Sequence, residues 1–202
     1  MNRFITEVRE FNPGFTLETA YVDIDRQHAH WYALYLRSRY EKVAHAELLE
    51  KGIESFLPMI EEIRVWSDRK KRILMPLFRG YLFVRTDLHN HVTILETDGV
   101  VHLVGIRGRP SRIPDEQIAW IKIVVGQPQR VKREPTLAAG ERVRVVVGPF
   151  SGVEGVISKV RGNARLVINL DAIAQAISVD VDPGFVKPVE RLVTDTSMVS
   201  SQ

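Results

Sequence analysis

The chain contains no cysteine among its 202 residues, which excludes disulfide bonds, thiolate metal ligands and cysteine nucleophiles. No apolar run approaches the roughly 18 residues that a membrane-spanning helix needs. The N-terminus lacks the charged-then-apolar pattern of a signal peptide. We therefore expect a soluble cytoplasmic protein with no membrane partner.

Sequence motifs of catalysis and cofactor binding are also missing. The chain has no Walker loop, no Rossmann glycine motif and no G-x-S-x-G element. The histidine pairs His28/His30 and His89/His91 lack a third ligand at a defined spacing, so surface or packing roles explain them better than a metal site. We expect no enzymatic activity, no cofactor and no bound metal.

The composition is that of an ordinary globular protein. Apolar residues make up 45% of the chain, which argues against disorder throughout. The net charge of +3 is modest and is weak evidence for a nucleic-acid partner.

The segment 127–137, Q-P-Q-R-V-K-R-E-P-T-L, reads as an exposed linker because it combines two prolines with many charges. It separates a mixed α/β domain, residues 29–126, from a strand-rich domain, residues 138–192. Residues 1–28 form an N-terminal extension, either a mobile tail or a segment packed on the next domain. Residues 193–202 are small and polar, and we expect them to be disordered.

The first domain begins with a buried strand in the run W-Y-A-L-Y-L from Trp31. Ser38 and Glu41 have the spacing of a capping box, and the helix that follows has Gly52 at its C-terminal end. Further strands are expected at 55–58, 60–66, 80–84 and 100–105, with helices near 87–95 and 114–126. The order β-α-β-β-α-β-α predicts an α+β sandwich, with helices on one face of a mostly antiparallel sheet.

The second domain contains the stretch V-R-V-V-V-G-P-F-S-G-V-E-G-V-I, residues 143–157. Two runs rich in β-branched residues flank a turn with glycine and proline, which predicts a hairpin of a small SH3-like β-barrel. The pattern resembles a KOW motif, which occurs in ribosomal proteins and transcription elongation factors.

Four segments occur together in the order typical of one family: W-Y-A-L-Y-L-R-S-R-Y-E-K from Trp31, R-G-Y-L-F-V from Arg79, D-G-V-V-H-L-V-G from Asp98 and the KOW stretch. Over roughly residues 29–190 the chain resembles the NusG-type transcription elongation and antitermination factors. The P-L-F-x-G-Y-L-F-V context is closer to specialised paralogues of the RfaH and UpxY kind. Arg79 stands where the family usually has proline.

The resemblance implies that the first domain binds the clamp helices of the RNA polymerase β′ subunit through an aromatic-lined depression. The matching positions are Tyr32, Tyr40, Phe78 and Tyr81. For Tyr32 and Tyr81, core packing is an equal alternative, whereas we assign Phe83 to the core. A weaker resemblance places His91 and Thr93 at a second polymerase contact, with an ordinary exposed helix face as the alternative.

The resemblance implies that cationic residues around two turns lie close to upstream or non-template DNA. Lys and Arg side chains there could follow phosphates, and Trp66 could stack on an unpaired base. A solvated charged loop is the alternative. The candidates are Arg37, Arg39, Arg64, Trp66, Arg69, Lys70, Lys71 and Arg72.

For the second domain, family analogy implies a small-subunit ribosomal protein or Rho as partner, and we expect Phe150, Ile173 and Ile177 to contact it. The stretch D-A-I-A-Q-A from Asp171 lacks the F-G-R element of housekeeping NusG, so the partner remains open. Strong β propensity on both sides of it predicts an independent β-barrel in the free protein, and not a helical hairpin.

Together these features predict a monomeric transcription elongation or antitermination factor that holds the polymerase clamp and recruits a second partner. The alternative is an RNA-binding or ribosome-associated KOW protein that does not bind polymerase.

Overall fold

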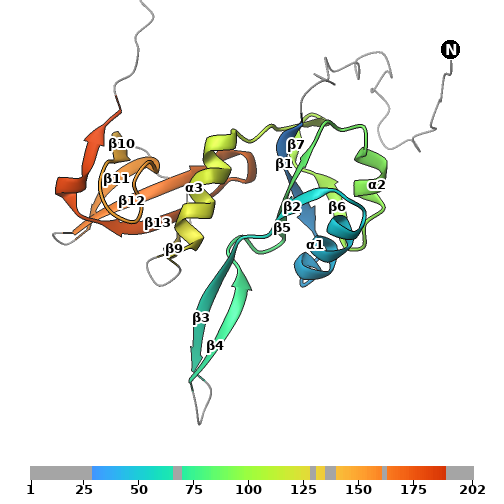
Figure 1. The fold of residues 1–202 in the computed structure, drawn as a ribbon, viewed down its shortest axis with the longest axis horizontal. Helices are drawn as coiled ribbons and strands as arrows, with labels where there is room; N and C mark the ends of the chain where they lie inside the picture. The colour runs from blue at the N-terminus through green and yellow to red at the C-terminus, as the bar shows by residue number, and fades with distance from the viewer. Residues whose placement is uncertain (1–28, 66–69, 128–130, 135–139, 161–162, 190–202) are drawn as a thin grey trace, which may run out of the picture.

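A four-stranded antiparallel sheet lies at the centre of the first domain in the computed structural model (Figure 1). In spatial order its strands are β2 (Glu54–Phe56), β5 (Tyr81–Thr86), β1 (His30–Leu36) and β6 (Val100–Leu103). The structure describes residues 29–65, 70–127, 131–134, 140–160 and 163–189.

Within the described residues, three α-helices and two hairpins accompany this sheet. The helices are α1 (Glu41–Glu50), α2 (His91–Leu95) and α3 (Asp115–Val125). The hairpins are β3 (Met59–Val65) with β4 (Lys70–Pro76), and β7 (Gly105–Ile106) with β8 (Arg109–Pro110). Figure 1 shows the β3–β4 hairpin extending away from the body of both domains.

Successive side chains of β1 enter two different cores, because neighbouring residues of a strand point to opposite faces of the sheet. Tyr32 and Leu34 are buried on the face that α1 and α2 cover. Trp31 and Ala33 are buried on the opposite face, which packs against α3. The continuous apolar run at the start of the domain is thus explained by a strand that is covered on both sides.

The α+β class and the antiparallel sheet are confirmed, but two local expectations were wrong. The final helix does not join the other two on one face of the sheet, since Ile118 and Ile121 of α3 pack on the opposite face. Tyr40 is the N-cap residue of α1, without a side-chain capping bond. The Glu41 carboxylate accepts a hydrogen bond from the backbone N–H of Gly80 (2.8 Å) and so ties two loops together, in place of the expected capping box.

The basic stretch after Trp66 is more regular than a turn. Lys70, Lys71 and Arg72 belong to β4, where Lys71 pairs with Arg64 of β3. The strand predicted to end at Trp66 therefore pairs with a second strand. That strand was not predicted, because its first residues are cations and not apolar residues.

A six-stranded antiparallel sheet forms the second domain, as its β-branched runs predicted. Its spatial order is β14, β10, β11, β12, β13, β9. The strands are β9 (Val131–Glu134), β10 (Arg142–Val145), β11 (Glu154–Val160), β12 (Asn163–Leu170), β13 (Gln175–Val181) and β14 (Val186–Pro188). Part of the segment expected to be a linker is thus an edge strand, because β9 pairs with β13.

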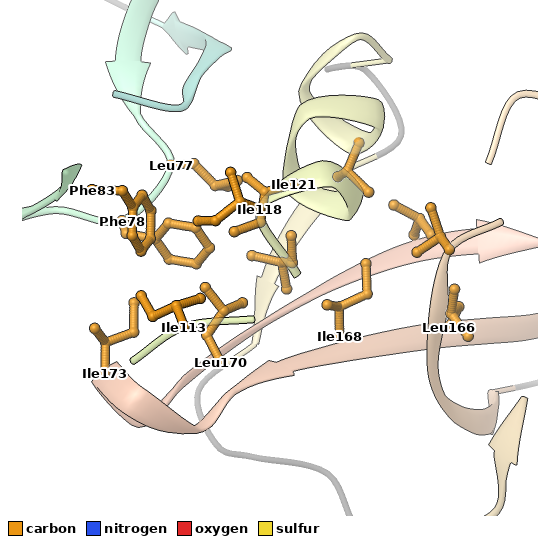
Figure 2. Close-up of a cluster of buried hydrophobic side chains, with 14 of the residues drawn as sticks. Leu77, Phe78, Phe83, Ile113, Ile118, Ile121, Leu166, Ile168, Leu170 and Ile173 are labelled. Carbon is orange, nitrogen blue, oxygen red and sulfur yellow. The ribbon is translucent and has the colours of Figure 1, made fainter. Parts of the chain in front are cut away.

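The two domains share one hydrophobic core, so the second domain is β-rich as expected but not separate from the first in this structure. Figure 2 shows Phe78 and Phe83 of the first domain beside Ile118 of α3. Leu170 and Ile173 of the second domain lie in the same cluster. Phe78 is only 1% exposed at this junction. Burying a phenylalanine side chain contributes about 1.5–3 kcal/mol, so the junction is a substantial contact.

Polar bonds from a single side chain add to this junction. Arg133 of β9 donates hydrogen bonds to the carbonyl oxygens of Pro76 and Leu77, both at 2.7 Å. The same guanidinium forms an ion pair with Glu62 of β3, and Glu62 also pairs with Arg79 at 3.4 Å. The peptide groups just before Phe78 are therefore held by the second domain.

Gly99 illustrates how tightly the start of α1 packs on the sheet. Its φ is +83°, and a Cβ at this position would lie far inside van der Waals contact with the Tyr40 side chain. The Gly99 carbonyl also accepts a hydrogen bond from the N–H of Arg37 (2.8 Å). A residue with a side chain has no room there.

Replacing Gly99 with alanine should destabilise the first domain more than replacing Gly52. Gly52 also has a left-handed φ, +73°, but a Cβ there would meet nothing within 4 Å. Both variants carry about 1–2 kcal/mol of backbone strain, and only Gly99→Ala adds a steric clash. Urea unfolding followed by tryptophan fluorescence measures the difference. Equal losses of stability would contradict the packing assigned to Gly99.

Candidate binding face of the first domain

Three aromatic rings lie in a row across the outer face of the first sheet. Tyr35 of β1 is directly opposite Tyr81 of β5 and His102 of β6. Its ring makes an edge contact with Tyr81 at a centroid distance of 5.5 Å and a tilted contact with His102 at 5.2 Å. Tyr35 is 40% exposed, although every other β1 residue after His30 is buried. We call these three residues the aromatic patch.

The aromatic patch is the uncovered end of a face that is otherwise closed. Tyr35 shares its side of β1 with Ala33 and Trp31, which lie beneath α3 and the second domain. Lys122 of α3 fixes this cover, since its ammonium lies 5.3 Å from the centroid of the Trp31 ring and 5.4 Å from that of Phe56. The exposed aromatic patch therefore continues the face of the sheet on which α3 and the second domain pack.

A groove of about 700 Å³ adjoins the patch, between the start of α1 and strand β4. Apolar side chains and cations both line it, and Leu74 on its β4 side is 50% exposed. The full lining is Tyr35, Leu36, Ser38, Arg39, Glu41, Lys42, Ile73, Leu74, Met75, Pro76, Arg79 and Gly80.

The charges of the groove are mainly positive. Arg39, Lys42 and Arg79 are exposed on its rim. The acid among the lining residues, Glu41, is 7% exposed and is bonded to the Gly80 N–H. The groove thus combines an apolar floor with a cationic edge, which suits a partner that carries apolar and acidic groups.

The four residues expected at the polymerase clamp do not form one surface in this structure. Tyr81 belongs to the aromatic patch and is half-buried. Phe78 is buried at the junction with the second domain, and Tyr32 is buried beneath α1 and α2. Tyr40 packs against Gly99, and Phe83 is in the core as predicted.

The cations expected near nucleic acid fall into three groups. Arg39 lines the groove, whereas Arg37, whose backbone N–H is bonded to the Gly99 carbonyl, does not belong to the lining. Lys71 and Arg72 are exposed along β4. For Arg64 and Lys70 the structure describes only the backbone, and Trp66 and Arg69 lie outside the described residues.

Acidic groups surround the turn beside Arg37. The Glu47 carboxylate accepts a hydrogen bond from the N–H of Asp98 (3.0 Å) and pairs with Lys51 at 2.6 Å. The hydrogen bond from Lys51, together with that from Asp98, lowers the pKa of Glu47, which is therefore ionised at neutral pH.

The remaining predicted residues are placed on α2 and in the second domain. His91 is exposed, with its Nδ1 3.1 Å from the Leu88 carbonyl oxygen, and Thr93, two residues further along α2, is half-buried. Phe150, Ile173 and Ile177 are all buried in the shared core, at 2%, 5% and 0% exposure. Among the described residues of that domain, the exposed large hydrophobic side chains are Val146, Val147 and Phe185.

Sequence reasoning missed Tyr35, His102 and Leu74. Tyr35 lies inside an apolar run without polar alternation, so no periodicity marks it as accessible. Leu74 follows a run of cations that concealed β4. Because side chains alternate along a strand, counting from Trp31 places Tyr35 on the same face as Ala33. Such a count does not show that α3 and the second domain leave Tyr35 uncovered.

Neither a metal site nor a membrane span appears in the described part of the chain. No group of three or more potential metal-ligating side chains is found there. No helix among these residues is long and apolar enough to cross a bilayer.

Comparison with known proteins identifies relatives of the first domain and of most of the chain. A family model described as transcription termination factor nusG matches residues 29–122. Proteins named transcription termination/antitermination protein NusG from Thermus thermophilus and Borreliella burgdorferi are each 28% identical to this chain, over 164 and 176 residues. These alignments cover 69% and 75% of this chain and 89% and 94% of the relatives.

A solved structure of NusG from Thermotoga maritima is 21% identical, with a TM-score of 0.47. That comparison covers 82% of this chain and 99% of the other.

Replacing Glu41 should loosen the turn that carries Phe78 and Tyr81. In Glu41→Ala the partly buried Gly80 N–H loses its acceptor, which should cost about 1–3 kcal/mol of local stability. Glu41→Gln keeps a side-chain oxygen at that place and is the matched control. Amide hydrogen exchange at Gly80 should become faster in the alanine variant alone. Unchanged protection in Glu41→Ala would show that the bond does not hold the turn.

Proposed function

We propose that the chain is a distant member of the NusG family of transcription factors and that its first domain binds the β′ clamp helices of RNA polymerase. By holding the clamp it suppresses pausing or termination during elongation. The chain is not an enzyme, in keeping with that family. It acts in the cytoplasm as a monomer bound to polymerase.

The open aromatic patch beside the groove is the observation that carries this proposal. The tip of a helical hairpin needs an apolar depression with a polar rim, and aromatic side chains supply contact area at a low cost in conformational entropy. Tyr35, Tyr81 and Leu74 are accessible at this place, and both tyrosines belong to the paired strands β1 and β5. A rigid sheet thus presents the contact residues.

The Phe78 contact requires that the second domain move away. Phe78 is buried beside Ile173 and Leu170, so a clamp helix reaches its ring only in an open form of the protein. The Arg133 bonds to Pro76 and Leu77 favour the closed form. Polymerase binding then opposes the closing free energy, and its apparent affinity is reduced by the fraction of molecules that are closed.

The released second domain recruits a further partner, for which a small-subunit ribosomal protein or Rho is the family analogy. Ile173 lies at the junction and becomes accessible on release, whereas Phe150 and Ile177 support the surface from within. The tether to the polymerase-bound first domain raises the effective concentration of that partner near the transcript.

Upstream or non-template DNA runs past the exposed cations of the hairpin. Lys71 and Arg72 project from β4, with Arg72 3.7 Å from Glu61 in a weak exposed pair. Phosphate contacts of this kind position the nucleic acid without reading its sequence. The P-L-F-R-G-Y-L-F-V segment favours a specialised RfaH/UpxY-like role over a housekeeping one.

Alanine at Tyr35 or Tyr81 should weaken binding to core RNA polymerase by about tenfold or more, because each removes an aromatic contact near the centre of the patch. Ile106→Ala is the control, since Ile106 is 73% exposed on the β7–β8 hairpin outside the patch. Binding is measured by fluorescence anisotropy with correctly folded variants. Undiminished affinity in both tyrosine variants would refute the site.

Salt-sensitive binding to ribosomal RNA without any polymerase binding would favour the alternative of a ribosome-associated protein.

Arg133→Ala should raise the apparent affinity for polymerase several-fold, because the closed form loses its hydrogen bonds to Pro76 and Leu77. Lys132→Ala is the matched control: its ammonium pairs with Asp180 inside the second domain at 3.2 Å. Titration of both variants with core polymerase measures the effect. An affinity for Arg133→Ala equal to that of the wild type would show that domain closure does not limit binding.

A further inference from the structure

Arg39 occupies a backbone conformation that arginine rarely adopts. It lies in the turn between β1 and α1 with φ at +71°, in the left-handed region where glycine carries no steric penalty. Local strain of this kind persists where the surrounding fold or a function requires it. A glycine would fit the same turn with less strain, so the side chain of Arg39 is not needed to form the turn.

The Arg39 side chain also contributes nothing visible to the fold. Within the described part of the chain its guanidinium has neither an ion pair nor a hydrogen bond. The other two cations of the groove differ in this respect, since Arg79 pairs with Glu62 and Lys42 donates to the Leu74 carbonyl at 3.5 Å. Arg39 is thus an exposed, uncommitted cation that lines the groove.

The surroundings of Arg39 indicate which chemistry it meets. Tyr35, Leu74 and Met75 give the groove an apolar lining, which a phosphate backbone would not use. The acid in the lining, Glu41, is already bonded to the Gly80 N–H. A partner that fills the groove therefore has apolar side chains and at least one carboxylate that pairs with the rim.

We propose that Arg39 binds a carboxylate on the protein element that enters the groove, and that it is not a DNA contact. This inference rests on the proposed function and requires a carboxylate at the tip of the polymerase clamp helices. Arg37, two residues earlier, remains the nucleic-acid candidate, because it is exposed and does not line the groove. A guanidinium–carboxylate pair beside apolar contacts fixes the orientation of the helix tip as well as adding affinity.

Binding of the full chain to core RNA polymerase, free of nucleic acid, tests this assignment. Arg39→Gly should weaken binding about tenfold at low salt, and by much less at 1 M salt, where charge pairs are screened. Its melting temperature should equal or exceed that of the wild type, because strain is relieved. Arg107→Gly is the matched control: Arg107 is exposed, has φ at +51° and lies outside the groove.

Each outcome decides for or against the proposal. Loss of affinity in Arg39→Gly alone, with the fold intact, supports it. Unchanged affinity, equal losses in both arginine variants, or a loss that appears only when DNA is added overturns it. If Tyr35→Ala and Tyr81→Ala also bind normally, the proposed function itself fails; if they lose binding and Arg39→Gly does not, only the role of Arg39 fails.

Discussion

Burial of the outer face of the first sheet determines how the two domains pack together. Because β1 is apolar on both sides, its second face must be covered, and α3 and the second domain cover most of it. The cover ends before Tyr35, so an aromatic row stays accessible next to buried Phe78. One surface therefore serves the chain's own packing and, in our proposal, its partner.

Both apolar and polar contacts hold the two domains together. The shared core supplies non-directional burial, which alone would tolerate small shifts of one domain against the other. Arg133 adds direction, since its guanidinium reaches two backbone carbonyls and Glu62 at once. Hydrogen bonds from a charged donor contribute about 1.5–3 kcal/mol each, which a competing partner can offset when it binds.

The turn between β1 and α1 organises the groove from its other side. Glu41 is buried because its charge is bonded to the Gly80 N–H, whereas Arg39 is exposed and left-handed. The charge of Glu41 therefore has a structural role, whereas that of Arg39 does not. A buried carboxylate fixes the loop that leads from Phe78 to Tyr81, and a free cation remains available to a partner.

The α+β class, the antiparallel sheet and the β-rich second domain could be predicted from the amino-acid sequence, because strand and helix periodicities are local properties of the chain. The burial of Phe83 was predicted as well. The three-dimensional packing was needed to show that Phe78 lies beneath the second domain, that Arg39 but not Arg37 lines the groove, and that Tyr35 is exposed. Which side chains are covered depends on contacts between residues far apart in the chain, and no local pattern encodes those contacts.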